Sequence, residues 1–274
     1  MLKTRLRGRT LNRVFYLFFI KIKKILFLIK QDLNMSLILN IESATDVCSI
    51  ALSQDGKLLS WVEEATNSHA SRMTLMIEKA LNQADAKIKD LAAVAISNGP
   101  GSYTSLRVGA STAKGICYAL DIPMIAVDTL TALALAAYQQ LKDDAALYCP
   151  MIDARRMEVY RTIFEKNTYL PDRQAEGVTV LEDLNNIIID ENTFENYLRQ
   201  GKKIVLTGNG AAKCQGVINS INILYVDKRC SAPYLIPLST EAFLKKAFVD
   251  IAYHTPQYLK SPNITSPKVK MLGF

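Results

Sequence analysis

An apolar run, a glycine-rich turn and a helical pattern follow one another between residues 91 and 120. The apolar run spans Leu91–Ser97, and the segment Gly99–Gly109 reads GPGSYTSLRVG. Glycine permits positive φ and lets another group approach the backbone, whereas Pro100 fixes one φ between two glycines. This order predicts a strand, a rigid turn and the start of a helix, which is the arrangement of a phosphate cradle or of another tight functional turn.

Three hydroxyl side chains follow this turn at Ser102, Tyr103 and Thr104. They lie where the first amides of the helix lack partners, so helix capping is an alternative to ligand binding. The turn taken alone is therefore weak evidence of function.

The charge of the chain is concentrated at its N-terminal end. The net charge is +7, but nine of the 33 Lys/Arg residues and only one of the 26 Asp/Glu residues fall in residues 1–34. Residues 35–274 consequently carry a formal charge of −1, with no basic excess to neutralise phosphates. We do not expect this part of the chain to bind nucleic acid directly.

Residues 1–34 form a basic extension whose apolar runs, Val14–Ile20 and Ile25–Ile29, are separated by lysines. Both runs are far shorter than the ~20 residues of a membrane span, and no small-residue cleavage site follows. The extension is either a basic amphipathic surface anchor or upstream sequence outside the native protein. We favour the second alternative, because Met35 directly precedes a clean strand pattern at Leu37–Ile41.

The five cysteines are scattered, without a CxxC pair. This usage is typical of a reduced, cytoplasmic protein. A zinc site is not expected, since the two histidines, His69 and His254, lie near no cysteine cluster.

The first half of the chain alternates between strand and helix patterns. The expected strands are Leu37–Ile41, Cys48–Ser53, Lys57–Glu63, Leu91–Ser97 and Pro123–Val127, and the expected helices are 68–83, 104–120 and Thr129–Tyr138. The Asp55-Gly56 pair predicts a hairpin. The helix after the glycine-rich turn has small residues on several sides, so another helix could approach it closely.

The second half repeats this order more loosely. We expect strands at Ala146–Ile152, Glu158–Phe164 and Lys203–Thr207, and a helix at Thr240–Ala252. The stretch Glu176–Gln200 is polar and weakly patterned. A domain boundary is expected near residue 140.

Three segments together resemble the TsaB (YeaZ) family. They are LNIESAT with CSIAL at residues 39–52, the GPGSYTSLRVG segment, and IDAR with EVY at residues 152–160. The match runs from Met35 to near the end of the chain, where Tyr258-Leu259 also resembles the usual family ending. We identify the chain as a member of this family on these motifs.

The resemblance implies an actin-like, ribonuclease H-like α/β fold of two domains with mixed sheets. The domains would span residues 35–139 and 140–274, and the C-terminal helix would pack on the first. This is the fold of the superfamily that contains sugar kinases, actin and Hsp70.

The resemblance also implies a non-catalytic dimerisation and activating subunit that binds the related catalytic subunit TsaD. With the ATPase TsaE, that assembly makes N6-threonylcarbamoyladenosine at position 37 of tRNAs that read codons beginning with A. ATP and a metal are expected in the partner subunits, and no cofactor in this chain. Binding of tRNA only through the complex, a cytoplasmic location and no membrane contact follow from the same resemblance.

TsaD-like enzymes hold a metal with two histidines four residues apart on a helix and a distant aspartate. The comparable positions here are His69 and Met73, so the second ligand is missing. A thioether does not replace imidazole for such a metal. We therefore expect no metal-ligating and no catalytic residue in this chain, and His69 is interpreted as a polar residue at a helix start.

Kinases of this superfamily place an aspartate on the first strand and glycines in the hairpin after it. Here the strand ends in Glu42, and no glycine occurs before Gly56. Ser43 and Thr45 could still donate hydroxyls to a nucleotide, and a second weak candidate is the turn at Gly208 and Gly210. Tight ATP binding is not expected.

The resemblance places the partner interface on helices 68–83 and 104–120, which would also pair two copies of the isolated chain. The predicted interface residues are His69, Arg72, Met73, Met76, Tyr103, Arg107, Gly109 and Ala113. Arg107 either covers the helix end or contacts the partner. Asp153 and Glu158 flank a turn, where local hydrogen bonding is a better interpretation than acid–base catalysis.

The alternative is an enzyme of the same superfamily, either an M22-like peptidase or a sugar-kinase-like ATP-binding enzyme. The peptidase lacks a metal-ligand set and a nucleophile–base pair in the sequence, and the kinase lacks the aspartate and the phosphate-binding glycine.

Overall fold

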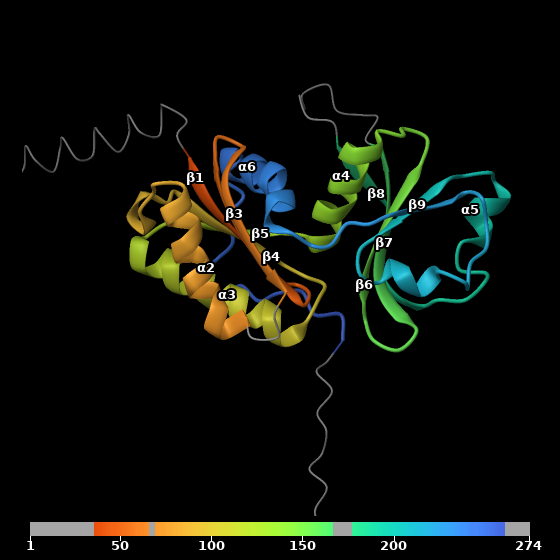
Figure 1. Ribbon diagram of the computed structural model, residues 1–274, viewed down its shortest axis with the longest axis horizontal. Coiled ribbons are helices and arrows are strands. Elements are labelled where there is room, and N and C mark those ends of the chain that lie inside the picture. Colours follow the sequence, from red (N-terminus) through yellow and green to blue (C-terminus); the bar gives the residue numbers. More distant parts are fainter. Residues whose placement is uncertain (1–35, 66–68, 167–176, 261–274) are drawn as a thin grey trace, which may run out of the picture.

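The computed structural model describes residues 36–65, 69–166 and 177–260, and within these residues the strands form two five-stranded sheets (Figure 1). The first sheet contains β1 (Leu37–Glu42), β2 (Val47–Gln54), β3 (Lys57–Ala65), β4 (Ala93–Ser97) and β5 (Met124–Val127). The second contains β6 (Leu147–Asp153), β7 (Glu158–Lys166), β8 (Val178–Ile188), β9 (Ile204–Thr207) and β10 (Ile223–Val226).

The two sheets have the same topology. Their strand orders are β3-β2-β1-β4-β5 and β8-β7-β6-β9-β10. In each sheet the first three strands are an antiparallel meander, and the last two run parallel to the first strand. The expected fold class, an actin-like arrangement of two α/β units with mixed sheets, is confirmed.

Local sequence explains where these elements begin and end. Asp55 and Gly56 both have positive φ, 50° and 76°, which is the geometry of a two-residue hairpin between β2 and β3. Ser102 caps α3 (Tyr103–Leu120), because its side chain accepts a hydrogen bond from Ser105 N. Asp128 caps α4 (Thr129–Leu141) through Thr131 N at 2.6 Å.

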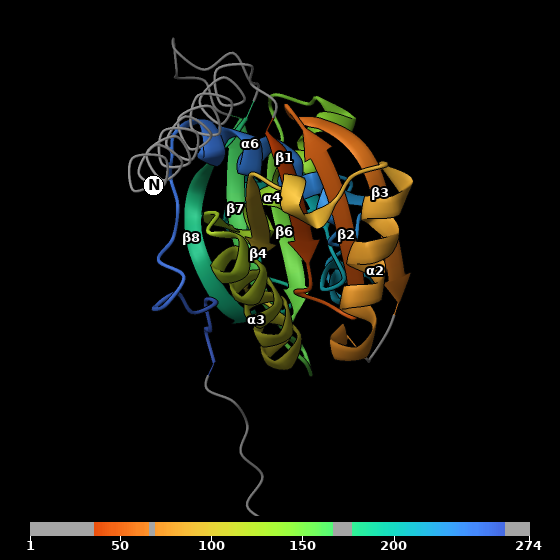
Figure 2. The same cartoon turned by 90° about the vertical axis from the view of Figure 1, so that its left-hand side faces the viewer.

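Helices cover both faces of the first sheet. On one face, α2 (His69–Gln83) packs on β2 and β3, and α3 packs on β4 (Figure 2). On the other face, α6 (Ile236–Leu244) packs on β1 and β5, next to the short helix η3 (Ala232–Leu235).

The two sheets are joined through a shared helical layer (Figure 1). The α4 helix packs on β6 and also contacts η3, so it lies between the second sheet and the helices on the first sheet. The far face of the second sheet is covered by the short helix α5 (Glu195–Arg199), the 3-10 helix η2 (Ala211–Cys214) and their flanking turns. A further 3-10 helix, η1 (Ile88–Asp90), precedes β4.

The expected helix at Thr240–Ala252 is misplaced. The structure begins this helix at Ile236 and ends it at Leu244. Lys246 then has a φ of 54°, which breaks the helical path, and Val249 forms a bridge with Met124 at the edge of β5. A proline at the N-terminal turn of α6 suits the earlier start, because its missing N–H is unpaired there in any helix.

Two strands of the structure were not predicted from the sequence. Residues 178–188, inside the stretch interpreted as weakly patterned, form β8, whose side chains are mostly exposed or half-buried. Residues 223–226 form the short edge strand β10, with two of four residues buried. Both strands lie at sheet edges, where a regular apolar pattern is not required.

The expected boundary near residue 140 falls at the end of α4, between the first sheet and the second, and the division into two domains stays a prediction. Residues 1–34 lie outside the described residues. In the part of the chain that is described, no helix has the length and apolarity needed to cross a membrane.

Burial on α2 gives a direct test of this packing. Met76 is 1% exposed in the first core, whereas the preceding residue of the same helix, Leu75, is 54% exposed. We expect Met76→Ala to lower the free energy of unfolding by about 2–5 kcal/mol, because it opens a cavity, and Leu75→Ala to change it by less than about 0.5 kcal/mol. Urea denaturation of both variants measures the difference, and equal effects would contradict this packing.

Candidate functional site

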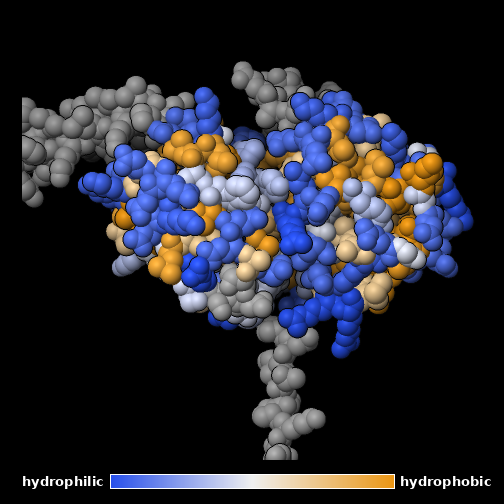
Figure 3. All heavy atoms as spheres, viewed as in Figure 1, coloured by the Kyte–Doolittle hydropathy of each residue, from blue (hydrophilic) through white to orange (hydrophobic). Residues whose placement is uncertain are grey.

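A cleft of about 1110 Å³ lies between the two sheets. Its walls come from the carboxyl ends of β1, β4, β6 and β9 and from the C-terminal segment. They include Ala44–Asp46, Pro100–Ser105, Ile152–Arg155, Gly208-Asn209, Asp227–Cys230 and Gln257–Lys260. The three segments that carry the family resemblance therefore meet at one place, and hydrophilic residues gather along this boundary in Figure 3.

The glycine-rich turn is held from three sides. Ser102 N donates to Ala44 O at 2.7 Å, which joins the turn to the hairpin after β1. Gly99 exchanges hydrogen bonds with Thr129 at the start of α4, each 3.1 Å long. Gln257 N donates to Asn98 O at 2.7 Å, so the C-terminal segment forms the third side.

The first hairpin lies directly against the glycine-rich turn and α3. A Cβ added to Gly101 would collide with the Ala44 carbonyl oxygen. A Cβ on Gly109 would collide with the Ser43 hydroxyl in the same way. Both glycines are thus required for packing of the first hairpin against the turn and the helix.

The other candidate cofactor residues have similar surroundings. Thr45 lines the cleft, but its hydroxyl accepts from Val47 N at 3.4 Å. Gly208 has a φ of 92°, and a Cβ there would collide with the Met151 carbonyl oxygen. A Cβ on Gly210 would lie 2.9 Å from the carbonyl carbon of Ile152.

Glycine at these turns allows one backbone segment of this chain to approach another, so packing within the chain accounts for it. The assignment of these residues to a nucleotide stays a prediction. Of the four candidate residues, Thr45 and Gly208 line the cleft, whereas Ser43 and Gly210 lie behind its wall.

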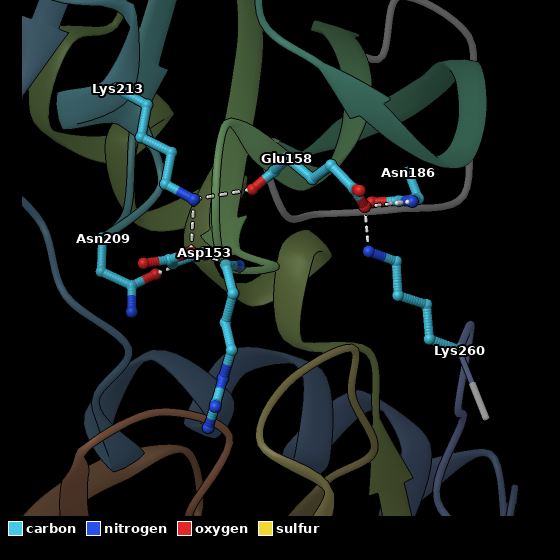
Figure 4. Close-up of polar contacts among 7 residues, drawn as sticks. Asp153, Glu158, Asn186, Asn209, Lys213 and Lys260 are labelled. Carbon is cyan, nitrogen blue, oxygen red and sulfur yellow. Dashed lines mark hydrogen bonds and ion pairs between the residues drawn. The ribbon is translucent and has the colours of Figure 1, made fainter. Parts of the chain in front are cut away.

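The turn between β6 and β7 is braced by hydrogen bonds (Figure 4). The Asp153 carboxylate accepts from Arg155 N and from Lys213 Nζ, both at 2.5 Å. Asp153 N donates to Asn209 Oδ1 at 3.0 Å. Arg155, with a φ of 70°, is exposed and lines the cleft. These bonds support the interpretation of Asp153 as a residue that orders the turn.

Glu158 lies on the neighbouring strand β7 and forms an ion pair with Lys260 (Figure 4). It also accepts from Asn186 Nδ2 at 2.9 Å. Its hydrogen bonds with Lys260 and then Asn186 hold the pKa of Glu158 below its usual range. A carboxylate kept ionised in this way suits an ion-pair role and not that of a general acid.

Glu42 ends β1 beneath the first hairpin and is 1% exposed. Its carboxylate accepts from Ala44 N at 2.7 Å. Burial raises the pKa of Glu42 to about 7, against the opposing effect of hydrogen bonds from Ala44, Ser97 and Ser43. Burial thus outweighs three hydrogen bonds at this position.

His69, at the start of α2, is 5% exposed, and its Nδ1 lies 3.4 Å from Ser105 Oγ. Met73, at the position of the second histidine of TsaD-like enzymes, is fully buried in the first core. Among the described residues, no three His, Cys, Asp or Glu side chains are grouped as metal ligands. All five cysteines are buried and unpaired, as expected for reduced thiols.

The predicted partner interface divides into buried and exposed residues. Met73, Met76, Gly109 and Ala113 are buried between their helices and the first sheet, as is His69. All five residues are buried in the isolated chain, and their contact with a partner stays a prediction. Their spacing marks the inner faces of α2 and α3, because an apolar stripe at helical period faces the core.

The other three predicted residues are accessible. Arg72 forms a bidentate pair with Glu64 at 2.8 and 2.9 Å on the surface. Tyr103 is half-buried, and its hydroxyl accepts from Arg107 Nη1 at 3.0 Å. Arg107 is exposed and lies over the Tyr103 ring, 5.3 Å from its centroid.

Sequence reasoning missed the outward residues of the same helices. Leu75 is 54% exposed on α2, beside a hollow lined by Glu78, Lys79, Asn82 and Gln83. The exposed side of α3 carries the small residues Thr104, Ser111, Gly115 and Ala119, and beside them the larger Arg107 and Tyr118, of which Tyr118 is 86% exposed. A Cβ added to Gly115 would meet no atom within 4 Å. Helical phase could have separated these residues from the core stripe.

A family model described as TsaD, tRNA N6-adenosine threonylcarbamoyltransferase, matches residues 63–270. The chain is 27% identical over 227 residues to the tRNA threonylcarbamoyladenosine biosynthesis protein TsaB of Escherichia coli, covering 82% of this chain and 94% of that protein. It is 35% identical over 127 residues to TsaB of Haemophilus influenzae, covering 46% of this chain and 52% of that protein.

Among solved structures, the chain resembles a Pseudomonas aeruginosa protein described as uncharacterized, with similarity to peptidase YeaZ. The TM-score is 0.70 at 25% identity, over 82% of this chain and all of that one. A second structure, YeaZ from the same organism, gives a TM-score of 0.66 at 24% identity. This likeness supports the fold described above.

The raised pKa of Glu42 makes stability depend on pH. Because the folded chain holds the proton more tightly than the unfolded chain, the contribution of Glu42 is most favourable below pH 4.5 and is lost as pH rises to about 7. We expect the difference in free energy of unfolding, Glu42→Gln minus the unmutated chain, to increase by about 3 kcal/mol when the pH is raised from 4.5 to 8. Urea denaturation of both chains at pH 4.5 and at pH 8 measures this increase. A difference in free energy of unfolding that is the same at the two pH values would contradict the prediction.

Proposed function

This chain belongs to the TsaB (YeaZ) family of tRNA threonylcarbamoyladenosine biosynthesis proteins, related to TsaD, and we propose that it is an accessory subunit that binds a TsaD-type catalytic subunit. In this role it stabilises and activates that subunit and performs no chemistry itself. The product is N6-threonylcarbamoyladenosine at position 37 of tRNAs that read codons beginning with A. A TsaE-type ATPase takes part, and tRNA contacts this chain only through the complex.

The observation that carries the proposal is the outer face of α2 and α3. These helices lie side by side on the first sheet (Figure 2), and the residues on their outer sides, Leu75 and Gly115 among them, are exposed. The distance between two packed helices depends on the side chains at their contact, so small residues allow a close approach. Ser111, Gly115 and Ala119 provide such small residues in the second half of α3, next to the exposed ring of Tyr118.

Gly115 is the most informative of these small residues. Glycine in a helix interior costs about 1 kcal/mol relative to alanine, and this glycine makes room for no side chain of its own chain. A partner helix lying against α3 would explain the glycine, because the absence of a Cβ leaves room for that helix. The exposed Leu75 on α2 adds an apolar contact for the same partner.

The packing and ion pairs around the cleft also support the accessory role. The two glycine-containing turns of the cleft are packed against other backbone segments, and Asp153 and Glu158 form ion pairs with Lys213 and Lys260. ATP and the metal are accordingly assigned to the partner subunits. A cytoplasmic location and self-pairing of the isolated chain through the same helices belong to this proposal.

Gly115→Phe tests the docking surface. The free chain should fold, because the site is open, but the ring should hold a partner helix away from α3 and lower the affinity for a TsaD-type subunit by at least about tenfold, which is ~1.4 kcal/mol. Isothermal titration with the purified partner measures the affinity, and sedimentation measures self-association, which should fall as well.

Two controls accompany this variant. Gly115→Ala should keep most of the affinity and raise the free energy of unfolding by about 0.5–1 kcal/mol. Gln140→Phe places the same ring on an exposed position of α4, away from the proposed surface, and should bind as the unmutated chain does. Unchanged affinity of Gly115→Phe would refute this docking surface.

A further inference from the structure

The C-terminal segment Gln257–Lys260 crosses from the first sheet to the second at the mouth of the cleft. Its beginning is fixed to the first sheet, because Gln257 N donates to Asn98 O directly after β4. A Cβ added to Gly99 would lie only 2.7 Å from the Gln257 carbonyl oxygen. Glycine at 99, with a φ of 101°, is therefore needed for the segment to lie this close.

The middle of the segment contacts the first turn of α3. The ring of Tyr258 packs on the ring of Tyr103 with 4.6 Å between centroids and a tilt of 46°. Arg107, one turn further along α3, covers the Tyr103 ring and donates to its hydroxyl. Stacked aromatic and cation–π contacts of this kind prefer definite geometries, so they orient the helix start.

The end of the segment is fixed to the second sheet. Lys260 forms an ion pair with Glu158 on β7, and its Nζ lies 5.9 Å from the centroid of the Tyr160 ring (Figure 4). Asn186 Nδ2 on β8 donates to the same Glu158 oxygen, Oε2, that pairs with Lys260. Each of these contacts is partly exposed and weak alone, so their effect depends on acting together.

We infer that Gln257–Lys260 is a strap whose residues Tyr258 and Lys260 are positioning residues for the docking surface. Only one residue separates these two anchors, so the sheets cannot change their mutual angle without breaking the aromatic contact or the ion pair. The strap thereby couples the spacing of the sheets across the cleft to the orientation of the first turn of α3. The part of this inference that concerns partner affinity rests on the proposed function.

The spacing is tested in the isolated full-length chain by electron–electron distance measurements. Two exposed residues, Lys89 beside the first sheet and Asn192 beside the second, are replaced by cysteines, and each cysteine carries a spin label. In the chain with unaltered residues 257–260, the distance between the two labels should have a single narrow distribution. Tyr258→Ala and Lys260→Glu should each broaden it, and unchanged distributions in both variants would overturn the strap.

Two rescue variants separate positioning from loss of folding. Tyr258→Phe keeps the ring and should restore the narrow distribution. Combining Lys260→Glu with Glu158→Lys re-creates the ion pair with its charges exchanged and should restore it as well. If neither rescue narrows the distribution, the contacts named here do not position the sheets.

Affinity for a TsaD-type subunit gives the second measurement. Tyr258→Ala and Lys260→Glu should weaken it by about tenfold, within the range usual for two coupled sites, and the rescue variants should recover it. Broadened distances with unchanged affinity would refute the coupling to docking. If the unmutated chain does not bind the partner, the proposed function fails, whereas the distance measurements still decide whether the strap sets the spacing.

Discussion

The close approach of two backbone turns, at Ala44 and Gly101, is the constraint on which the rest of the structure depends. Ser102 N donates to Ala44 O, and no side chain fits between the two segments. The contact fixes the end of β1 against the end of β4 and sets the direction in which α3 leaves the sheet. The same turn is bonded to the start of α4 and to Gln257, so the second sheet and the strap are positioned from it.

The same kind of backbone contact accounts for the glycines on both sides of the cleft. One strand of each sheet, β4 in the first and β9 in the second, ends at the cleft in a glycine-containing turn. In both turns a backbone carbonyl group of a neighbouring segment takes the space beside the glycine, Ala44 in one and Met151 in the other. The repeated topology thus places the same kind of closed turn on both sides of the cleft.

Much of this architecture is predictable from the sequence because it depends on local patterns. The hairpin at Asp55-Gly56, the strand before Gly99 and the helix cap at Ser102 all follow from turn chemistry and periodicity within a few residues. β8 was not predictable in this way, since its partner β7 supplies the pairing that its own polar side chains do not indicate. The packing reasons for Gly101 and Gly208 involve segments more than fifty residues away, which no local pattern reveals.

The proposed interface illustrates the same limit on a single helix. Met73 and Met76 belong to the stripe that also contains Ile77, Ala80 and Leu81, and that stripe faces the sheet. The surface proposed for a partner lies outside the stripe, where an apolar or conformationally costly residue is exposed. Leu75 and Gly115 meet this condition, since one exposes a large apolar side chain and the other lowers helix stability without packing against anything. Intramolecular packing accounts for Gly101 and Gly109 but not for Gly115, and the proposed partner helix against α3 would supply the contact that is missing there.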